Sequence, residues 1–171
     1  MLIRRLLQTF LDIALWRKGP QDLPASGLLL VMVLFAYVVV GFCAVRLLAL
    51  DQRAAAVFIS VDVLMLCGWL WVVLAFFGRR QRFVQTITAT FGVGALVLLL
   101  VIAVRATQML IGPANAFAGN WLLLRFLISA IVLGRIFMLA LDRGLITGMA
   151  LTVAIVYSTA AVVQLALERL G

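Results

Sequence analysis

Hydrophobic positions along the chain fall into five long runs that short polar clusters separate. The runs cover about residues 27–47, 54–77, 84–104, 121–141 and 145–167. Each holds the ~20 residues that a helix needs to cross ~30 Å of hydrocarbon. Backbone polar groups find no water in that layer, so such runs must be helical. The pattern predicts an all-α, polytopic transmembrane bundle of five spans.

The first 18 residues show a different pattern, which predicts an amphipathic helix. Apolar residues recur there at helical spacing, while Arg4, Arg5 and Asp12 fall on the opposite side. Such a helix is too polar to span a bilayer and is expected to lie in the headgroup plane. A signal peptide is the alternative, disfavoured because polar residues interrupt its apolar part and no small-residue cleavage site follows. The turn-rich segment 19–26 is a linker to the five-helix domain, 27–171.

The distribution of basic residues predicts the orientation of the bundle. The connections are short, so helices that follow one another in sequence are antiparallel neighbours. One side of the membrane then receives eight basic residues and the other receives four, which places the N-terminus in the cytoplasm and the C-terminus outside. The eight are Arg4, Arg5, Arg17, Lys18, Arg79, Arg80, Arg82 and Arg143, and the four are Arg46, Arg53, Arg105 and Arg169.

Composition supports a membrane protein and explains the excess positive charge. The chain is 67% hydrophobic and 12% charged, whereas soluble domains average about 45–50% and about 25%. The net charge of +8 lies in clusters between apolar runs, which favours anionic lipid over nucleic acid as the partner. The chain is rich in Arg, Ala, Leu and Val, which is typical of proteins from GC-rich bacterial genomes. We therefore expect the protein in a bacterial inner membrane. Expected headgroup contacts are Arg4, Arg5, Arg17, Lys18, Arg79, Arg80, Arg82 and Arg135.

The residues that carry most enzymatic chemistry are missing. The chain has no histidine, which removes bis-histidine haem, histidine-ligated zinc and Ser-His-Asp catalysis. Phosphate-binding glycine motifs and metal-ligand spacings are also absent from the sequence. Cys43 and Cys67 fall inside apolar runs and are expected to pack as small hydrophobes. We therefore expect a protein that is not an enzyme and holds no cofactor or metal.

Asp62 is the strongest candidate for a functional residue, because it lies inside the second hydrophobic run. A carboxylate within the membrane is a functional-site hypothesis by default, and Arg125 in the fourth run is its most plausible partner. The pair would either couple a proton or small cation, or fix the register of two helices. A lone acid makes a poor proton relay, so the structural interpretation is favoured.

Small and hydroxyl residues predict close contacts between helices. Small side chains allow helix backbones to approach, either within one protomer or between protomers. Polar residues within the runs are expected to form hydrogen bonds between helices, namely Thr86, Thr88, Thr90, Ser129, Tyr157, Ser158 and Gln164. The small residues expected at helix contacts are Gly92, Gly94, Ala130, Gly134, Gly144 and Gly148.

One stretch resembles a known family of membrane proteins. The segment GRRQRFVQTITATFGVGALVLL, 78–99, looks like the second cytoplasmic turn and the Gly-bearing third helix of the Yip family. The short N-terminal segment, the proline-bearing linker and five closely spaced helices fit the same layout. The resemblance implies a non-enzymatic scaffold or accessory subunit. The acidic and aromatic segment that would support Rab GTPase binding in eukaryotic members is missing here, so that role is not carried over.

The functional expectation is a non-enzymatic membrane protein that binds protein or lipid partners as a scaffold or accessory subunit. The partner protein is unidentified, and a second copy of the chain is one candidate. The alternative is a small oligomeric transporter or channel that uses Asp62 and Arg125. A third is a membrane subunit whose catalytic partner is another chain.

Overall fold

The computed structural model describes residues 2–47, 51–111 and 117–169, which form helices joined by short turns and contain no strand. Side chains are described for 4–47, 51–107 and 127–169. The predicted all-α class is thereby confirmed. In chain order the elements are α1 (Leu2–Ala14), η1 (Pro20–Asp22), α2 (Gly27–Leu47), α3 (Gln52–Phe76), η2 (Arg80–Arg82), α4 (Phe83–Ile111), α5 (Phe117–Leu141) and α6 (Leu145–Glu168).

Four helices, α2, α3, α4 and α6, are long and apolar enough to cross a membrane. In α5 the part with described side chains, Leu127–Leu141, is also apolar. The observed α2 has the bounds of the first predicted span, whereas α4 continues to Ile111, past the expected end at 104. Hydrophobicity marks only the part of a helix that lies in hydrocarbon, and intrahelical hydrogen bonds carry the helix beyond it.

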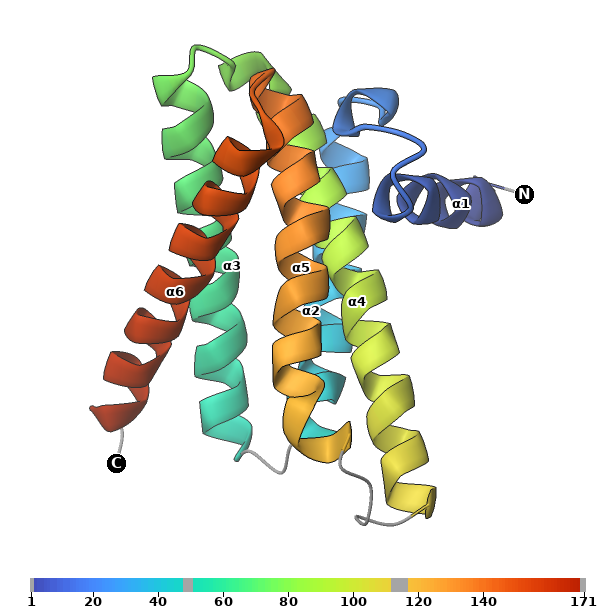
Figure 1. Cartoon of the computed structure of the whole chain (residues 1–171), viewed down its shortest axis with the longest axis vertical. Helices are drawn as coiled ribbons and strands as arrows, with labels where there is room; N and C mark the ends of the chain where they lie inside the picture. Colours follow the sequence, from blue (N-terminus) through green and yellow to red (C-terminus); the bar gives the residue numbers. More distant parts are fainter. Residues whose placement is uncertain (1, 48–50, 112–116, 170–171) are drawn as a thin grey trace.

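Helix α4 packs against three of the other long helices and against α1, while α5 lies between α4 and α6 (Figure 1). Every residue from Thr86 to Val93 is buried, which requires neighbours on all sides of this part of the helix. It packs mainly on α2, and also on α1, α3 and α5, while α6 packs on α5 and α3.

The threonines of α4 do not form the hydrogen bonds between helices that the sequence analysis expected. Each hydroxyl instead donates to the carbonyl oxygen four residues earlier in the chain, with distances of 2.8, 2.6 and 2.9 Å for Thr86, Thr88 and Thr90. A buried hydroxyl needs an acceptor, and its own helix offers the nearest one. These threonines therefore pack as small residues with their polar atoms satisfied locally. The expectation is confirmed at Ser158 of α6, whose hydroxyl oxygen accepts a hydrogen bond from Trp69 Nε1 of α3 at 3.0 Å.

Helices α5 and α6 cross in direct backbone contact at two glycines. A Cβ atom on Gly148 would lie 2.0 Å from the carbonyl oxygen of Gly134, so only glycine permits this approach. Gly144, by contrast, has no neighbour within 4 Å of the position of a Cβ atom. From this crossing the two helices diverge toward the C-terminal end of α6 (Figure 1).

Helix α1 lies across the bundle and is docked on α4 (Figure 1). Its Phe10 ring occupies the space that a side chain at Gly92 would fill, since a Cβ there would be 2.3 Å from Phe10 Cε1. Arg135 of α5 donates to the carbonyl oxygen of Trp16 at 3.1 Å and stacks on its ring at 4.7 Å. Gly92 is nine residues into α4, so α1 crosses it about 14 Å from the start of that helix.

Candidate functional site

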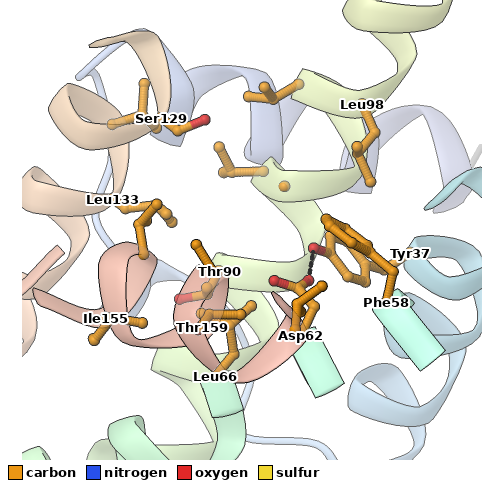
Figure 2. A pocket seen from close by; sticks show the side chains of 17 residues that line it. Tyr37, Phe58, Asp62, Leu66, Thr90, Leu98, Ser129, Leu133, Ile155 and Thr159 are labelled. Carbon is orange, nitrogen blue, oxygen red and sulfur yellow. Dashed lines mark hydrogen bonds between the residues drawn. The ribbon is translucent and has the colours of Figure 1, made fainter. Parts of the chain in front are cut away.

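Tyr37, Asp62 and Gly94 bring three helices together in the interior of the bundle. The Tyr37 hydroxyl of α2 donates to Asp62 Oδ2 of α3 at 2.5 Å (Figure 2). The Tyr37 ring packs against Phe91 with its centroid 5.0 Å away, and it passes α4 at Gly94. A Cβ atom on Gly94 would lie 2.9 Å from Tyr37 Cε2. The missing side chain at Gly94 thus lets the tyrosine lie against α4 and reach the carboxylate.

The Asp62 side chain lies on the wall of a cavity of about 390 Å³, to which all five long helices contribute (Figure 2). Most of the wall is aliphatic or aromatic. Among the lining residues with described side chains, the polar ones are Tyr37, Asp62, Thr90, Ser129 and Thr159. The arrangement is that of a typical small-molecule site, where a few placed polar groups interrupt an apolar lining.

Thr159 of α6 contributes a buried hydroxyl to this wall. The residue is 7% exposed, and its Oγ1 atom has no hydrogen-bond partner within the part of the chain whose side chains are described. Thr90, on the same wall, donates to its own helix. A buried hydroxyl without a partner costs about 1–3 kcal/mol. Thr159 therefore marks a place where a bound polar atom would stabilise the protein.

One lining residue of the cavity, Ala160 of α6, is also exposed. It follows the buried Thr159 directly in the chain. The nearby Tyr157 is 78% exposed, which shows that this face of α6 has no protein covering within the described chain.

The predicted partner of Asp62 lies outside the residues that have described side chains. The Asp62–Arg125 pair therefore stays a prediction. Sequence reasoning missed Tyr37, whose hydroxyl bonds to Asp62. The available signal was that Tyr37 is the one hydroxyl-bearing residue in the hydrophobic run 27–47 and lies near its middle. Gly94 was expected at a helix contact, but its partner proves to be an aromatic ring.

The expected cytoplasmic arginines form an ionic cluster that joins two loops. Arg79 and Arg82 contact the Asp142 carboxylate at 2.9 and 3.1 Å. Arg82 Nη1 also donates to the carbonyl oxygens of Leu139 and Ala140, both at 3.2 Å, at the C-terminal end of α5. The hydrogen bond from Arg82, with the positive charges of Arg82 and Arg79, lowers the pKa of Asp142.

Two further arginines of this region lie over aromatic rings. Arg80 lies 5.6 Å from the centroid of Trp71, and Arg143 lies 5.5 Å from that of Phe77. These distances suit cation–π attraction. At the other basic segment, Arg4, Arg5 and Arg17 are exposed, while Lys18 pairs with Asp12 at 2.9 Å. Contact with anionic headgroups stays a prediction for all of them.

Known proteins supply no template for this site. Within the described chain no cluster of three or more His, Cys, Asp or Glu residues could hold a metal ion. Comparison of the chain with models of protein families, with curated proteins and with solved structures finds no match.

Proposed function

We propose that this is a non-enzymatic membrane protein of five spans that binds a small molecule within the bilayer, in the cavity beside Asp62. The observation that carries the proposal is the Asp62 carboxylate on the wall of an interior cavity of about 390 Å³. A carboxylate inside a membrane is costly and usually marks a substrate or ion pathway.

The cavity itself supports a ligand. Protein interiors are close-packed, and voids larger than a water molecule are few. An empty void lowers stability roughly in proportion to its volume. A protein that acted only as a scaffold would gain nothing from this void or from an unsatisfied hydroxyl at Thr159. We therefore rank ligand binding, as in a carrier or a sensing subunit, above the scaffold role that the sequence favoured.

The scaffold or accessory role keeps one supporting observation and remains our second proposal. Leu64, Trp71, Val72 and Phe76 of α3 are exposed by 50% or more, and this apolar surface suits lipid or the helix of a partner. The Yip resemblance would fit this second role.

We further propose that the N-terminus is cytoplasmic, the C-terminus is outside and the membrane is a bacterial inner membrane. The positive-inside rule supports this orientation. Figure 1 shows α1 toward the same end of the bundle as the α3–α4 and α5–α6 connections. This shared end also supports the proposed orientation.

The proposal is tested by analysing what the protein carries out of its native membrane. Full-length protein released in mild detergent should carry a small molecule that native mass spectrometry detects. Asp62→Asn and the cavity-filling Thr159→Phe should both lose it. Asp51→Asn, which changes the same residue type at the start of α3, should keep it. Identical bound molecules in all four proteins, or none in any, would refute ligand binding in this cavity.

A further inference from the structure

We infer that the molecule bound in the cavity is an uncharged amphiphile, with one hydroxyl or carbonyl group on an apolar body, and that the Thr159 hydroxyl binds this group. The inference rests on the proposed function and adds the chemical class of the ligand and the residue that recognises it.

Thr159 differs from the other buried threonines in the part of the chain whose side chains are described. Thr86, Thr88, Thr90 and Thr152 each donate to the carbonyl oxygen four residues earlier, at 2.6–2.9 Å. Thr159 Oγ1 has no partner among the described groups, although the residue is only 7% exposed. A helix thus offers a simple way to satisfy a buried threonine, and Thr159 does not use it.

The acceptor that Thr159 would use in its own helix is already occupied. It is the carbonyl oxygen of Ile155, which accepts the Ser158 hydroxyl at 2.9 Å. A carbonyl oxygen has two acceptor positions, and the α-helical bond from the backbone amide of Thr159 takes the other. Ser158 is held in place because it also accepts from Trp69 Nε1 of α3 at 3.0 Å. The Thr159 hydroxyl therefore needs a partner outside its own helix.

The cavity is where that partner binds, because Thr159 lines it. Threonine in a helix divides between two χ1 rotamers, so a rotation about one bond can turn Oγ1 toward a bound group. A hydroxyl offers one donor and two acceptor positions. A carbonyl oxygen or a hydroxyl of the ligand therefore satisfies it.

The rest of the lining sets an apolar body without charge. An ionised group in apolar surroundings loses its hydration at a far higher cost than a neutral hydroxyl or carbonyl, for which one hydrogen bond compensates. An alkyl or aromatic body loses no hydrogen bonds there. The apolar lining residues include Phe58, Leu66, Leu133, Ile155 and Val163.

Two threonine variants on α6 test whether the Thr159 hydroxyl is unsatisfied. Thr159→Val removes the hydroxyl and keeps the shape of the side chain. Thr152→Val makes the same change at a hydroxyl that donates to the Gly148 carbonyl oxygen. In full-length protein washed free of small molecules in detergent, Thr152→Val should melt lower than the wild type. Thr159→Val should melt at the same temperature or higher, because it loses only an unsatisfied group. Equal losses in the two variants would overturn the assignment of Thr159.

Four probes with one ten-carbon body test the class of the ligand. Decanol, decane, decylamine and decanoate are each added to the washed full-length protein, and bound probe is counted by native mass spectrometry. The wild type should bind decanol about fivefold more tightly than decane, since a neutral hydrogen bond contributes about this factor. Thr159→Val should lose the preference for decanol, and Thr152→Val should retain it.

Three results would overturn the inference. They are equal binding of decanol and decane by the wild type, an unchanged preference in Thr159→Val, and tighter binding of decylamine or decanoate than of decanol. These failures are distinguishable from failure of the proposed function. A charged molecule that the protein carries out of its native membrane would contradict the class and leave ligand binding in the cavity standing.

Discussion

Asp142 shows how one exposed carboxylate links the α3–α4 and α5–α6 connections at one end of the bundle. It pairs with Arg79 and Arg82 of the α3–α4 connection, while Arg82 also binds the last carbonyls of α5. An exposed pair contributes little by itself, but a network with helix carbonyls holds its geometry better. The lowered pKa of Asp142 reports that the folded protein favours the charged form.

The first prediction follows from the sign of that shift. A carboxyl group with a lowered pKa in the folded state stabilises the protein above its unfolded-state pKa, and the contribution is lost as pH falls through the folded-state pKa. Asp142→Asn should therefore lower the melting temperature in detergent modestly at pH 7. The difference from the wild type should vanish as the pH falls below the ordinary carboxyl range. A difference that grows on acidification would contradict this account.

The second prediction concerns Asp62 and Arg125. If they pair inside the membrane, removing one partner strands the other charge, which costs about 3–5 kcal/mol, whereas replacing both with apolar residues is nearly neutral. Asp62→Asn and Arg125→Leu should each lower thermal stability in detergent, and Asp62→Leu with Arg125→Leu should recover much of the loss. Additive losses in the double variant would exclude the pair. The recovered double variant should nevertheless lose the small molecule that the wild type carries if the carboxylate holds the ligand.

Among the secondary-structure elements, α5 and α6 meet in backbone contact at Gly134 and Gly148. The small residues Ala130 and Gly134, and Gly144 and Gly148, predicted close contacts between helices. The sequence did not indicate which of the glycines would meet. Helical periodicity shows that two small residues share a face, but only the tertiary fold determines that Gly134 meets Gly148 while Gly144 stays open.

The third prediction compares one substitution at two glycines. Gly148→Ala forces a methyl group to within 2.0 Å of the Gly134 carbonyl oxygen, and such overpacking costs about 1–3 kcal/mol. Gly68→Ala in α3 meets nothing within 4 Å, and alanine is the better helix former by about 0.5–1 kcal/mol. In thermal unfolding in detergent, the first variant should melt lower than the wild type and the second at the same temperature or higher. Equal stability of the two variants would show that the backbones of α5 and α6 lie farther apart at Gly148 than in this structure.

Helix α1 shows where prediction from sequence reaches its limit. Its amphipathic pattern predicted a helix at 1–18, and α1 is observed at Leu2–Ala14. The pattern could not show that its apolar face divides in two. Phe10 and Ile13 are buried in the bundle, while Leu7, Leu11 and Leu15 face outward. That division depends on the space at Gly92, which lies more than 80 residues away in sequence.

At the scale of the whole molecule, the sequence predicted the class of fold better than the site. Long apolar runs are strong signals because each must satisfy its own backbone hydrogen bonds. The cavity gives no such signal, because it depends on the divergence of α5 and α6 and on the approach of Tyr37 past Gly94. The single acid in a hydrophobic run identified Asp62 as a candidate site residue. The sequence did not indicate that Tyr37 and Thr159 would line the same cavity.

The fourth prediction concerns the topology of the entire chain. Five spans with a cytoplasmic N-terminus place the C-terminus outside, as the excess of basic residues on one side indicates. A phosphatase fused after Gly171 should be active, because that enzyme works only on the outer side of a bacterial inner membrane. A fluorescent protein that folds only in the cytoplasm should stay dark at the same position. The reverse pattern would mean an even number of spans.

The contact between Gly134 and Gly148 also makes the position of the C-terminal part of α6 sensitive to small rotations about that contact. The backbones touch near the N-terminal end of α6, and Val163, which lines the cavity, lies 15 residues, or about 22 Å, further along the helix. A rotation of α6 by only about 5° around the contact displaces Val163 by about 2 Å, which is comparable to the radius of a methyl group. A small change of angle at the two glycines would therefore change the width of the cavity at Val163. Close packing at Gly134 and Gly148 thus constrains the space that a bound molecule would occupy.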